Sequence, residues 1–303
     1  MTIPSDEELT RFYGLPVVAV EDGLRAGIEQ AAWKIPPAFH EGTEPLLDQF
    51  SRLVEQVSVQ ALVIGNWGGA FEAAPVAEIL ELADRLPDLR ALFLADISPD
   101  ECEISWIQHG DITPLFAAFP KLEVFRVRGS SGLVMEPIAH AALRELAFET
   151  GGLPAGVTRA VAASDLPALE HLELWFGEEE YGCDTTLEDV APILVGERLP
   201  ALRHLGLRNC EFADLLAAAL AGAPIVPRLT SLDLSLGLLS DEGVGQLLDG
   251  QSLTHLTSLD LHWHSVSEEG LERLGGALPD VRIDASESQA GEPEDERYVA
   301  VGE

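Results

Sequence analysis

Cysteine is scarce in this sequence, and its placement argues against two common ways of stabilising a fold. The chain contains only Cys102, Cys183 and Cys210. Their number is odd, they lie far apart, and no CxxC pair occurs. Disulfide frameworks and structural zinc sites depend on paired or closely spaced cysteines. We therefore expect neither of them here.

Positive charge is also scarce. The 303 residues include 18 Lys and Arg against 52 Asp and Glu, which gives a formal net charge of −34. Nucleic-acid backbones and anionic membrane surfaces are bound through clustered Lys and Arg. We therefore expect the chain to bind neither nucleic acid nor membrane. The excess of carboxylates favours a partner that carries a basic surface.

Long apolar runs and enzyme signatures are missing as well. No apolar stretch approaches the ~20 residues that a membrane-spanning helix needs, and residues 1–14 lack the pattern of a secretory signal. The sequence has no GxSxG, HExxH or GxxxxGKS/T motif, and no GxGxxG follows a predicted strand. We expect a cytoplasmic protein with no catalytic residues and no cofactor.

What the sequence does contain is a repeat, Leu-x-x-Leu-x-Leu, often with Pro after the first Leu. The clearest copies lie at 86–97, 166–177, 199–210, 228–236 and 253–264. The alternation of apolar residues is typical of a strand with one buried face. One apolar residue in each copy can serve as a marker, and the markers follow one another about 27 residues apart. The nine markers are Leu62, Leu92, Phe125, Leu146, Leu172, Leu205, Leu232, Leu259 and Val281.

The segments between the markers have the spacing of amphipathic helices. Apolar residues recur every three to four positions in 75–86, 240–250 and 267–278. Residues 185–196 follow the same pattern, although Pro192 requires a first-turn position or a kink. Parallel strands need a crossover between them. One strand and one helix per repeat therefore predict an α/β solenoid, a horseshoe with a concave parallel sheet and convex helices.

The LPxLxxLxL copies with helical crossovers resemble leucine-rich-repeat proteins of the ribonuclease-inhibitor-like subclass, whose repeats span ~20–29 residues. The Ala-, Leu- and Glu-rich composition and the closing RYVAVGE are similar to an uncharacterised bacterial family of leucine-rich-repeat proteins. This resemblance implies a bacterial binding protein and brings no catalytic residues. The chain departs from the consensus, because the Asn expected after each strand is found only at Asn66 and Asn209, out of place.

The two ends of the chain differ from the repeats. We predict an N-terminal cap (1–56), a leucine-rich-repeat solenoid of about nine repeats (57–286), and an acidic linker with a C-terminal edge strand (287–303). In the cap, 15–20 and 31–35 are expected to form a strand pair, followed by an amphipathic helix over 44–57. At the C-terminus, 298–301 alternates like a strand that would protect the open edge of the sheet. The alternative is a disordered tail.

The same alternation identifies the side chains on the concave face. The first two predicted strands of the solenoid present small and apolar residues, whereas the later ones present charged residues, His and Trp. Protein interfaces are rich in Trp, Tyr and Arg. The candidate partner-binding residues are Arg126, Arg128, His171, Glu173, Trp175, His204, Arg208, Asp233, Asp260, His262 and Trp263. Asp280, Arg282 and Asp284 are expected to continue this face on the last strand. The alternative is that the Trp residues pack under loops and the charges form solvated ion pairs that contribute under ~1 kcal/mol each.

The register of the strands predicts which of these side chains are neighbours. Adjacent strands lie ~4.8 Å apart, so His171 should lie beside His204, and Arg208 should lie near Trp175 and Ser235. Asp233 and Asp260 should face each other at the same level of two neighbouring strands.

A metal chelate is a further alternative for the histidines. His262 and His264 form a His-x-His pair, and Asp260 is a possible third ligand. Nothing in the sequence fixes a fourth ligand, and we predict no metal site.

Three functions are compatible with these features. The first is a scaffold that binds a protein or peptide on its concave sheet and has no catalysis of its own. The second is an accessory subunit that presents a substrate to a partner enzyme. The third is a metal-dependent enzyme that uses His and Asp of the last strands. We predict the first.

Overall fold

The computed structural model of the chain describes residues 9–35, 46–67 and 72–302. Across these residues, one sheet of twelve strands runs from β1 to β12 in the order of the sequence. The strands are β1 (Arg11–Phe12), β2 (Leu15–Ala19), β3 (Ala32–Ile35), β4 (Ala61–Ile64), β5 (Ala91–Leu94), β6 (Val124–Arg128), β7 (Glu145–Glu149), β8 (His171–Gly177), β9 (His204–Cys210), β10 (Ser231–Asp233), β11 (Ser258–Asp260) and β12 (Arg282–Asp284). β1 and β2 are antiparallel, and every later neighbouring pair is parallel.

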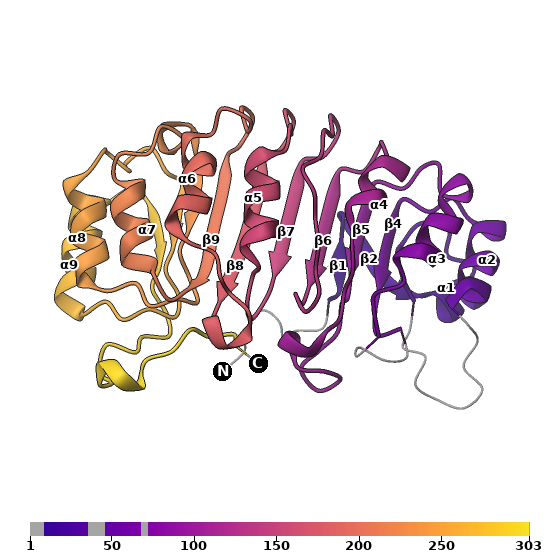
Figure 1. The fold of residues 1–303 in the computed structure, drawn as a ribbon, viewed down its shortest axis with the longest axis horizontal. Coiled ribbons are helices and arrows are strands. Elements are labelled where there is room, and N and C mark those ends of the chain that lie inside the picture. The colour runs from indigo at the N-terminus through magenta and orange to yellow at the C-terminus, as the bar shows by residue number, and fades with distance from the viewer. Residues whose placement is uncertain (1–8, 36–45, 68–71, 303) are drawn as a thin grey trace.

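Helices cover one face of this sheet, and the strands lie side by side in an arc behind them (Figure 1). Within the described residues the α-helices are α1 (Val20–Ala26), α2 (Leu46–Gln56), α3 (Val76–Glu81), α4 (Thr113–Ala118), α5 (Ala155–Ala163), α6 (Leu187–Val195), α7 (Ala213–Leu220), α8 (Asp241–Asp249) and α9 (Glu268–Ala277). Short 3₁₀ turns are η1 (Ala83–Arg85), η2 (Ile104–Trp106), η3 (Glu179–Tyr181), η4 (Val226–Arg228) and η5 (Glu294–Glu296). The predicted solenoid with its convex helices is confirmed, but the prediction of one helix in every repeat is wrong for residues 129–144, which connect β6 to β7 without a helix.

The repeat leucines set the register of the sheet. Eight of the nine markers stand opposite one another on successive strands, from Leu62 on β4 to Leu259 on β11. These side chains are buried and pack against apolar residues of the helices, such as Leu216 of α7 and Leu247 of α8, in one continuous core. Each repeat therefore buries its apolar face against its neighbours, which is the source of stability in a solenoid.

The ninth marker, Val281, is wrong by two residues. Leu259 pairs with Ile283, so Ile283 occupies the marker position on β12. Val281 instead closes the turn before the strand, where its amide donates a hydrogen bond to the carbonyl of Leu278. The last repeat has a single residue, Arg282, between Val281 and the marker position, whereas the repeats with an LPxLxxLxL pattern have two residues between the corresponding leucine and the marker. Asp280 consequently does not belong to the concave face.

The sheet continues into the predicted N-terminal cap. The expected strand pair is present as β2 and β3, and β3 pairs in parallel with β4 without a gap. Trp33 of β3 stands opposite Leu62, in the marker position. The expected helix is α2. The division of the chain at residue 57 stays a prediction.

Short polar side chains begin several of the helices. The Ser240 hydroxyl accepts a hydrogen bond from the amide of Glu242 at the start of α8, and the Ser267 hydroxyl does the same for Gly270 of α9. Thr186 and Asp189 form a reciprocal capping box on α6. These caps fix the points at which the chain turns from the sheet into the convex layer. No helix in the described residues is long and apolar enough to cross a membrane.

The C-terminal segment is not the edge strand that the alternation predicted. Residues 297–302 have no strand structure, and β12 is the last strand of the sheet. In Figure 1 the yellow segment leaves β12 and returns below the carboxyl ends of the strands towards β8. There the amide of Val301 donates to Asn209 Oδ1 at 3.0 Å, and Asn209 Nδ2 donates back to the Val301 carbonyl at 2.5 Å. The segment therefore closes one side of the concave face rather than the end of the sheet.

Candidate functional site

The N-terminal part of the concave face is covered by the chain itself. Phe12 of β1 lies against Phe93 of β5, with the ring centroids 6.0 Å apart. The concave side chains Ala32, Ala61 and Ala91 are buried in the same small apolar cluster. Small side chains leave room for the β1–β2 hairpin to pack on the sheet. This part of the concave face is therefore closed to a partner.

The C-terminal segment covers the concave face next to the carboxyl ends of the strands. Trp175 is 2% exposed and Trp263 is 4% exposed, and both belong to an apolar cluster that includes Val301. The Trp263 indole donates a hydrogen bond to the carbonyl of Tyr298. The expectation that these two Trp residues supply exposed contact area is therefore wrong. They hold the C-terminal segment in place.

The two arginines of β6 are held by carboxylates of β7. Arg126 Nε lies 2.6 Å from Glu145 Oε1, and Arg126 Nη1 lies 3.3 Å from Glu149 Oε1. Arg128 is buried and lies 2.8 Å from the other oxygen of Glu149, while its Nη1 donates to the carbonyl of Ile97. Buried charges require such pairing. Arg126 remains partly exposed, whereas Arg128 is removed from any contact surface.

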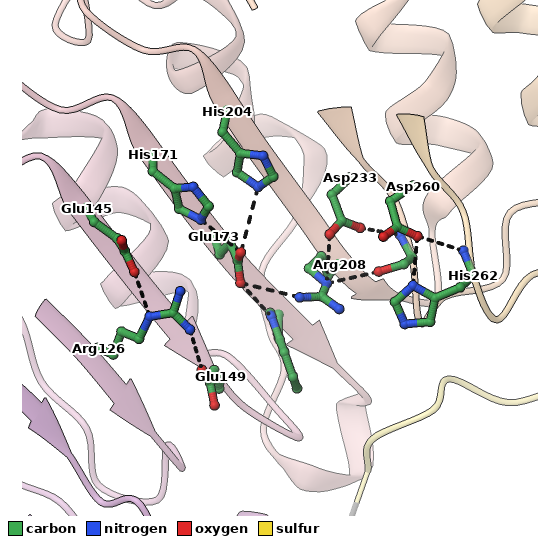
Figure 2. A network of polar contacts seen from close by, with 12 residues as sticks. Arg126, Glu145, Glu149, His171, Glu173, His204, Arg208, Asp233, Asp260 and His262 are labelled. Carbon is green, nitrogen blue, oxygen red and sulfur yellow. Dashed lines mark hydrogen bonds and ion pairs between the residues drawn. The ribbon is translucent and has the colours of Figure 1, made fainter. Parts of the chain in front are cut away.

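Glu173 of β8 stands at the centre of the concave face (Figure 2). Its two carboxylate oxygens face different groups. Oε1 lies 2.8 Å from His171 Nε2 and 3.7 Å from His204 Nε2, and Oε2 lies 3.4 Å from both Arg208 Nη1 and the Trp175 indole nitrogen. Burial alone would favour the neutral carboxyl, but the His171 hydrogen bond and the Arg208 charge hold the pKa of Glu173 well below its usual range. Glu173 is therefore a carboxylate at neutral pH.

The two histidines beside Glu173 form a stack, as the register predicts. The rings of His171 and His204 are 3.9 Å apart between centroids and inclined by 9°. Burial lowers the pKa of His204 to about 4, and the neighbouring His171 contributes to the shift. Nδ1 of His204 lies 2.7 Å from the Ser231 hydroxyl, while its Nε2 is buried and makes no hydrogen bond. His204 is therefore neutral at physiological pH and presents an unpartnered nitrogen.

Arg208 of β9 links Glu173 to the strands that follow. Its guanidinium lies over the Trp175 ring at 4.7 Å, and its Nε donates to the Ser235 hydroxyl at 2.9 Å. The same nitrogen lies 3.2 Å from Asp233 Oδ2. The predicted proximity of Arg208 to Trp175 and Ser235 is confirmed. Arg208 is itself buried, so it organises the site from within.

Asp233, Asp260 and Asp284 form a row of carboxylates across β10, β11 and β12. Each accepts a hydrogen bond from the amide two residues later, which closes the end of its strand. Burial and the nearby Asp260 raise the pKa of Asp233. For Asp260, the His262 hydrogen bond outweighs the effect of burial and lowers the pKa. In this row Asp233 is buried, whereas Asp260 is partly exposed and Asp284 is exposed.

A shallow pocket of about 740 Å³ lies over this row of carboxylates. Its polar lining residues are His204, Ser231, Asp233, Ser258, Asp260, Arg282 and Asp284. Arg282 and Asp284 are exposed and Asp260 is partly exposed, so these side chains are accessible from the concave side. Figure 2 shows that Asp233 and Asp260 lie next to each other, beside Arg208. The accessible part of the predicted partner-binding surface is thus concentrated on β8–β12.

The structure does not support the alternative of a His262–His264 chelate. His262 Nδ1 lies 2.7 Å from Asp260 Oδ1 on the concave side. His264 is fully buried, and its two ring nitrogens are engaged with the carbonyl of Ala285 and the amide of Val266. Within the described part of the chain, the three metal-ligating groups that come together are instead His171, Glu173 and His204, whose ligand atoms lie within 4.8 Å of one another.

Comparison with known proteins gives structural matches only. No protein-family model and no curated protein matches the chain. A crystal structure of a protein from Bacteroides fragilis is 28% identical, with a TM-score of 0.81 over 93% of this chain and 83% of that chain. The complex of TLR13 with ssRNA13 is 16% identical, with a TM-score of 0.45 over 85% of this chain and 36% of that one.

A leucine-rich-repeat protein from Leptospira interrogans is 14% identical, with a TM-score of 0.21 over 87% of this chain and 98% of that chain. The latter two scores are too low to support an argument about this molecule. The architecture follows from the chain's own structure, in which consecutive LxxLxL strands pair in parallel and in register and each helical crossover returns on the same face. The fold of this chain is a leucine-rich-repeat solenoid.

Proposed function

We propose that this chain is a protein-binding scaffold that recognises a basic protein or peptide segment on the open part of its concave sheet, β8–β12, and has no catalysis of its own. The observation that carries the proposal is the concentration of accessible concave side chains in this region, although Arg126 and Glu145 also stay partly exposed beside the β1–β2 hairpin. The β1–β2 hairpin covers the N-terminal strands, and the C-terminal segment covers Trp175 and Trp263. The region between these two coverings includes a pocket lined mainly by polar side chains.

The charge of the pocket supports a basic partner. Its lining includes Asp233, Asp260 and Asp284, and Arg282 is the one arginine or lysine among the lining residues. Hydrogen bonds to the backbone hold each carboxylate at the end of its strand, so little ordering is required on binding. Complementary charges of this kind speed association and select partners. A lysine- or arginine-rich segment has the matching charge.

The test is quantitative affinity capture with three proteins: the intact chain, a double variant Asp260→Asn and Asp284→Asn, and a control. The Asn side chains retain an oxygen that can accept the same backbone hydrogen bonds. The control, Glu242→Gln and Asp249→Asn, removes the same charge from exposed positions of the convex helix α8. The substitutions avoid Trp175, Trp263 and Arg208, because those residues are buried and their loss would perturb the fold.

We expect a partner that the intact chain and the control retain and that the pocket variant binds at least tenfold more weakly. The purified partner should dissociate more readily as salt rises, because salt screens exposed charges. Equal capture by all three proteins would refute the concave pocket as the binding surface. A captured partner without a basic surface would refute the charge argument, and turnover of a small substrate would refute the non-catalytic assignment.

A further inference from the structure

The strands bring two histidines and one carboxylate to a single point on the concave face. His171 and Glu173 are two residues apart on β8, so their side chains share a face of the sheet. His204 stands opposite His171 on β9. Two imidazoles and one carboxylate form the donor set of many zinc sites that keep an open coordination position.

The spacing of the donor atoms is close to that of a metal site. A tetrahedral ion with bonds of ~2.0–2.1 Å separates its ligand atoms by roughly 3.3 Å. The distances from Glu173 Oε1 to His171 Nε2 and to His204 Nε2 are 2.8 and 3.7 Å, one slightly shorter and one slightly longer. An ion would take the place of the proton between His171 and Glu173. The parallel rings must then rotate apart, and His171 has room to do so because 29% of its side chain is exposed.

Neighbouring groups prepare each donor for this role. His204 Nδ1 lies 2.7 Å from the Ser231 hydroxyl, and Nε2 is buried without a hydrogen bond. In the tautomer with its proton on Nδ1, His204 donates to Ser231, and Nε2 has a free lone pair for an ion. Such a partner on the second nitrogen is usual for histidines that bind metal. Arg208 and the Trp175 indole engage Oε2 of Glu173, so Oε1 is turned towards the histidines.

We propose that His171, Glu173 and His204 form a site for a divalent transition-metal ion of the zinc type, with its remaining coordination position open to the concave pocket. His204 lines that pocket, so a water molecule or a donor group of a bound partner can complete the coordination. The proposal is independent of the binding function above, and it replaces the sequence-based prediction of no metal site. Arg208 competes with the ion for the negative charge of Glu173 and so weakens the site. Its contact is with Oε2, however, which leaves Oε1 to bind the ion.

Calorimetric titration of zinc chloride into protein treated with a chelator and then dialysed tests the proposal. The variants are His171→Asn and His204→Gln, and the control is His262→Gln, which removes a concave histidine outside the cluster. We expect one ion per chain for the intact protein and the control, and at least tenfold weaker binding for the two variants. Circular dichroism checks that all four proteins are folded.

Two further measurements keep the test decisive. Co²⁺ in place of Zn²⁺ should give the visible absorption of a four-coordinate ion in the intact protein, whether or not a variant folds. Excess Ca²⁺, which prefers oxygen ligands, should not displace the ion. The proposal is overturned if the intact chain binds no zinc, if both histidine variants bind it as well as the intact chain does, or if Ca²⁺ displaces it, since the ion would then lie on the acidic surface.

Discussion

Asn209 joins the end of β9 to the C-terminal segment, and its replacement should release that segment. The residue is fully buried, and its Nδ2 donates to the carbonyls of Val301 and Thr150, while Oδ1 accepts from the Val301 amide. Its backbone has a φ of 53°, a left-handed conformation that Asn tolerates better than Ala. Asn209→Ala removes three hydrogen bonds at about 1 kcal/mol each. With about 1 kcal/mol for the backbone, we expect a loss of about 4 kcal/mol.

A thermodynamic cycle separates the contribution of the C-terminal segment. Deleting residues 297–303 removes the partner of two of the three hydrogen bonds, so Asn209→Ala in the shortened chain should cost about 2 kcal/mol or less. The coupling between the substitution and the deletion should therefore be about 2 kcal/mol. Asn209→Gly serves as a second control. It loses the same hydrogen bonds but accepts the positive φ, so it should be milder than Asn209→Ala by about 1 kcal/mol.

The assay is equilibrium unfolding in urea, followed by circular dichroism, for the four proteins of the cycle and the Gly variant. Limited proteolysis of the folded proteins should cut the C-terminal segment faster in the Asn209→Ala variant than in the intact chain. If the substitution costs the same in the full and the shortened chain, within about 0.5 kcal/mol, Asn209 does not hold the segment. The account of why Trp175 and Trp263 are buried would then be wrong as well.

Three further changes test the same structure. Burial lowers the pKa of His109 to about 4, so the unfolded chain, with an ordinary His, binds a proton first as the pH falls. His109 should therefore contribute a loss of stability of up to about 3 kcal/mol between about pH 6.5 and pH 4. His109→Gln should remove that share of the fall in urea unfolding measured across this range, and the similar share of His204 should remain. Gly177→Ala should destabilise the chain by several kcal/mol and lower its melting temperature, because φ is 75° and a Cβ would overlap the carbonyl of Gly151. Phe12→Ala should remove the contact with Phe93, lower stability by about 3 kcal/mol, and increase binding of an apolar dye to the uncovered sheet.

The register of the sheet could be read from the sequence because one side-chain pattern is repeated. A shift of one residue would turn every leucine of a strand to the wrong face, so the alternation around Leu172 and Leu205 fixes the pairing. The stack of His171 on His204 follows from that pairing. The error at Val281 arose because the last repeat has one residue fewer between the turn residue and the marker, so that Val281 and Ile283 are both apolar candidates for the marker position.

The coverings of the concave face could not be read in the same way. Contacts of Phe12 with Phe93, and of Val301 with Asn209, join segments that are far apart in the sequence and belong to no repeat. Each of these two contacts is reflected in the sequence only indirectly. Ala61 and Ala91 were visible as small residues on a surface that would otherwise be open, and RYVAVGE was visible as an apolar ending after an acidic stretch. Neither signal identifies the segment that packs there.

The two coverings also explain why the accessible surface is polar. An exposed sheet face with Phe93, Trp175 and Trp263 would be a large apolar patch, which a soluble protein rarely leaves open. The β1–β2 hairpin and the C-terminal segment cover these apolar residues. The side chains that stay accessible are polar ones, such as Asp260 and Asp284, which gain little free energy from burial. Substitutions at these positions can then leave the core intact, because the leucines that hold the repeat face the other side. The accessible part of the concave face is therefore determined by what the β1–β2 hairpin and the C-terminal segment leave uncovered.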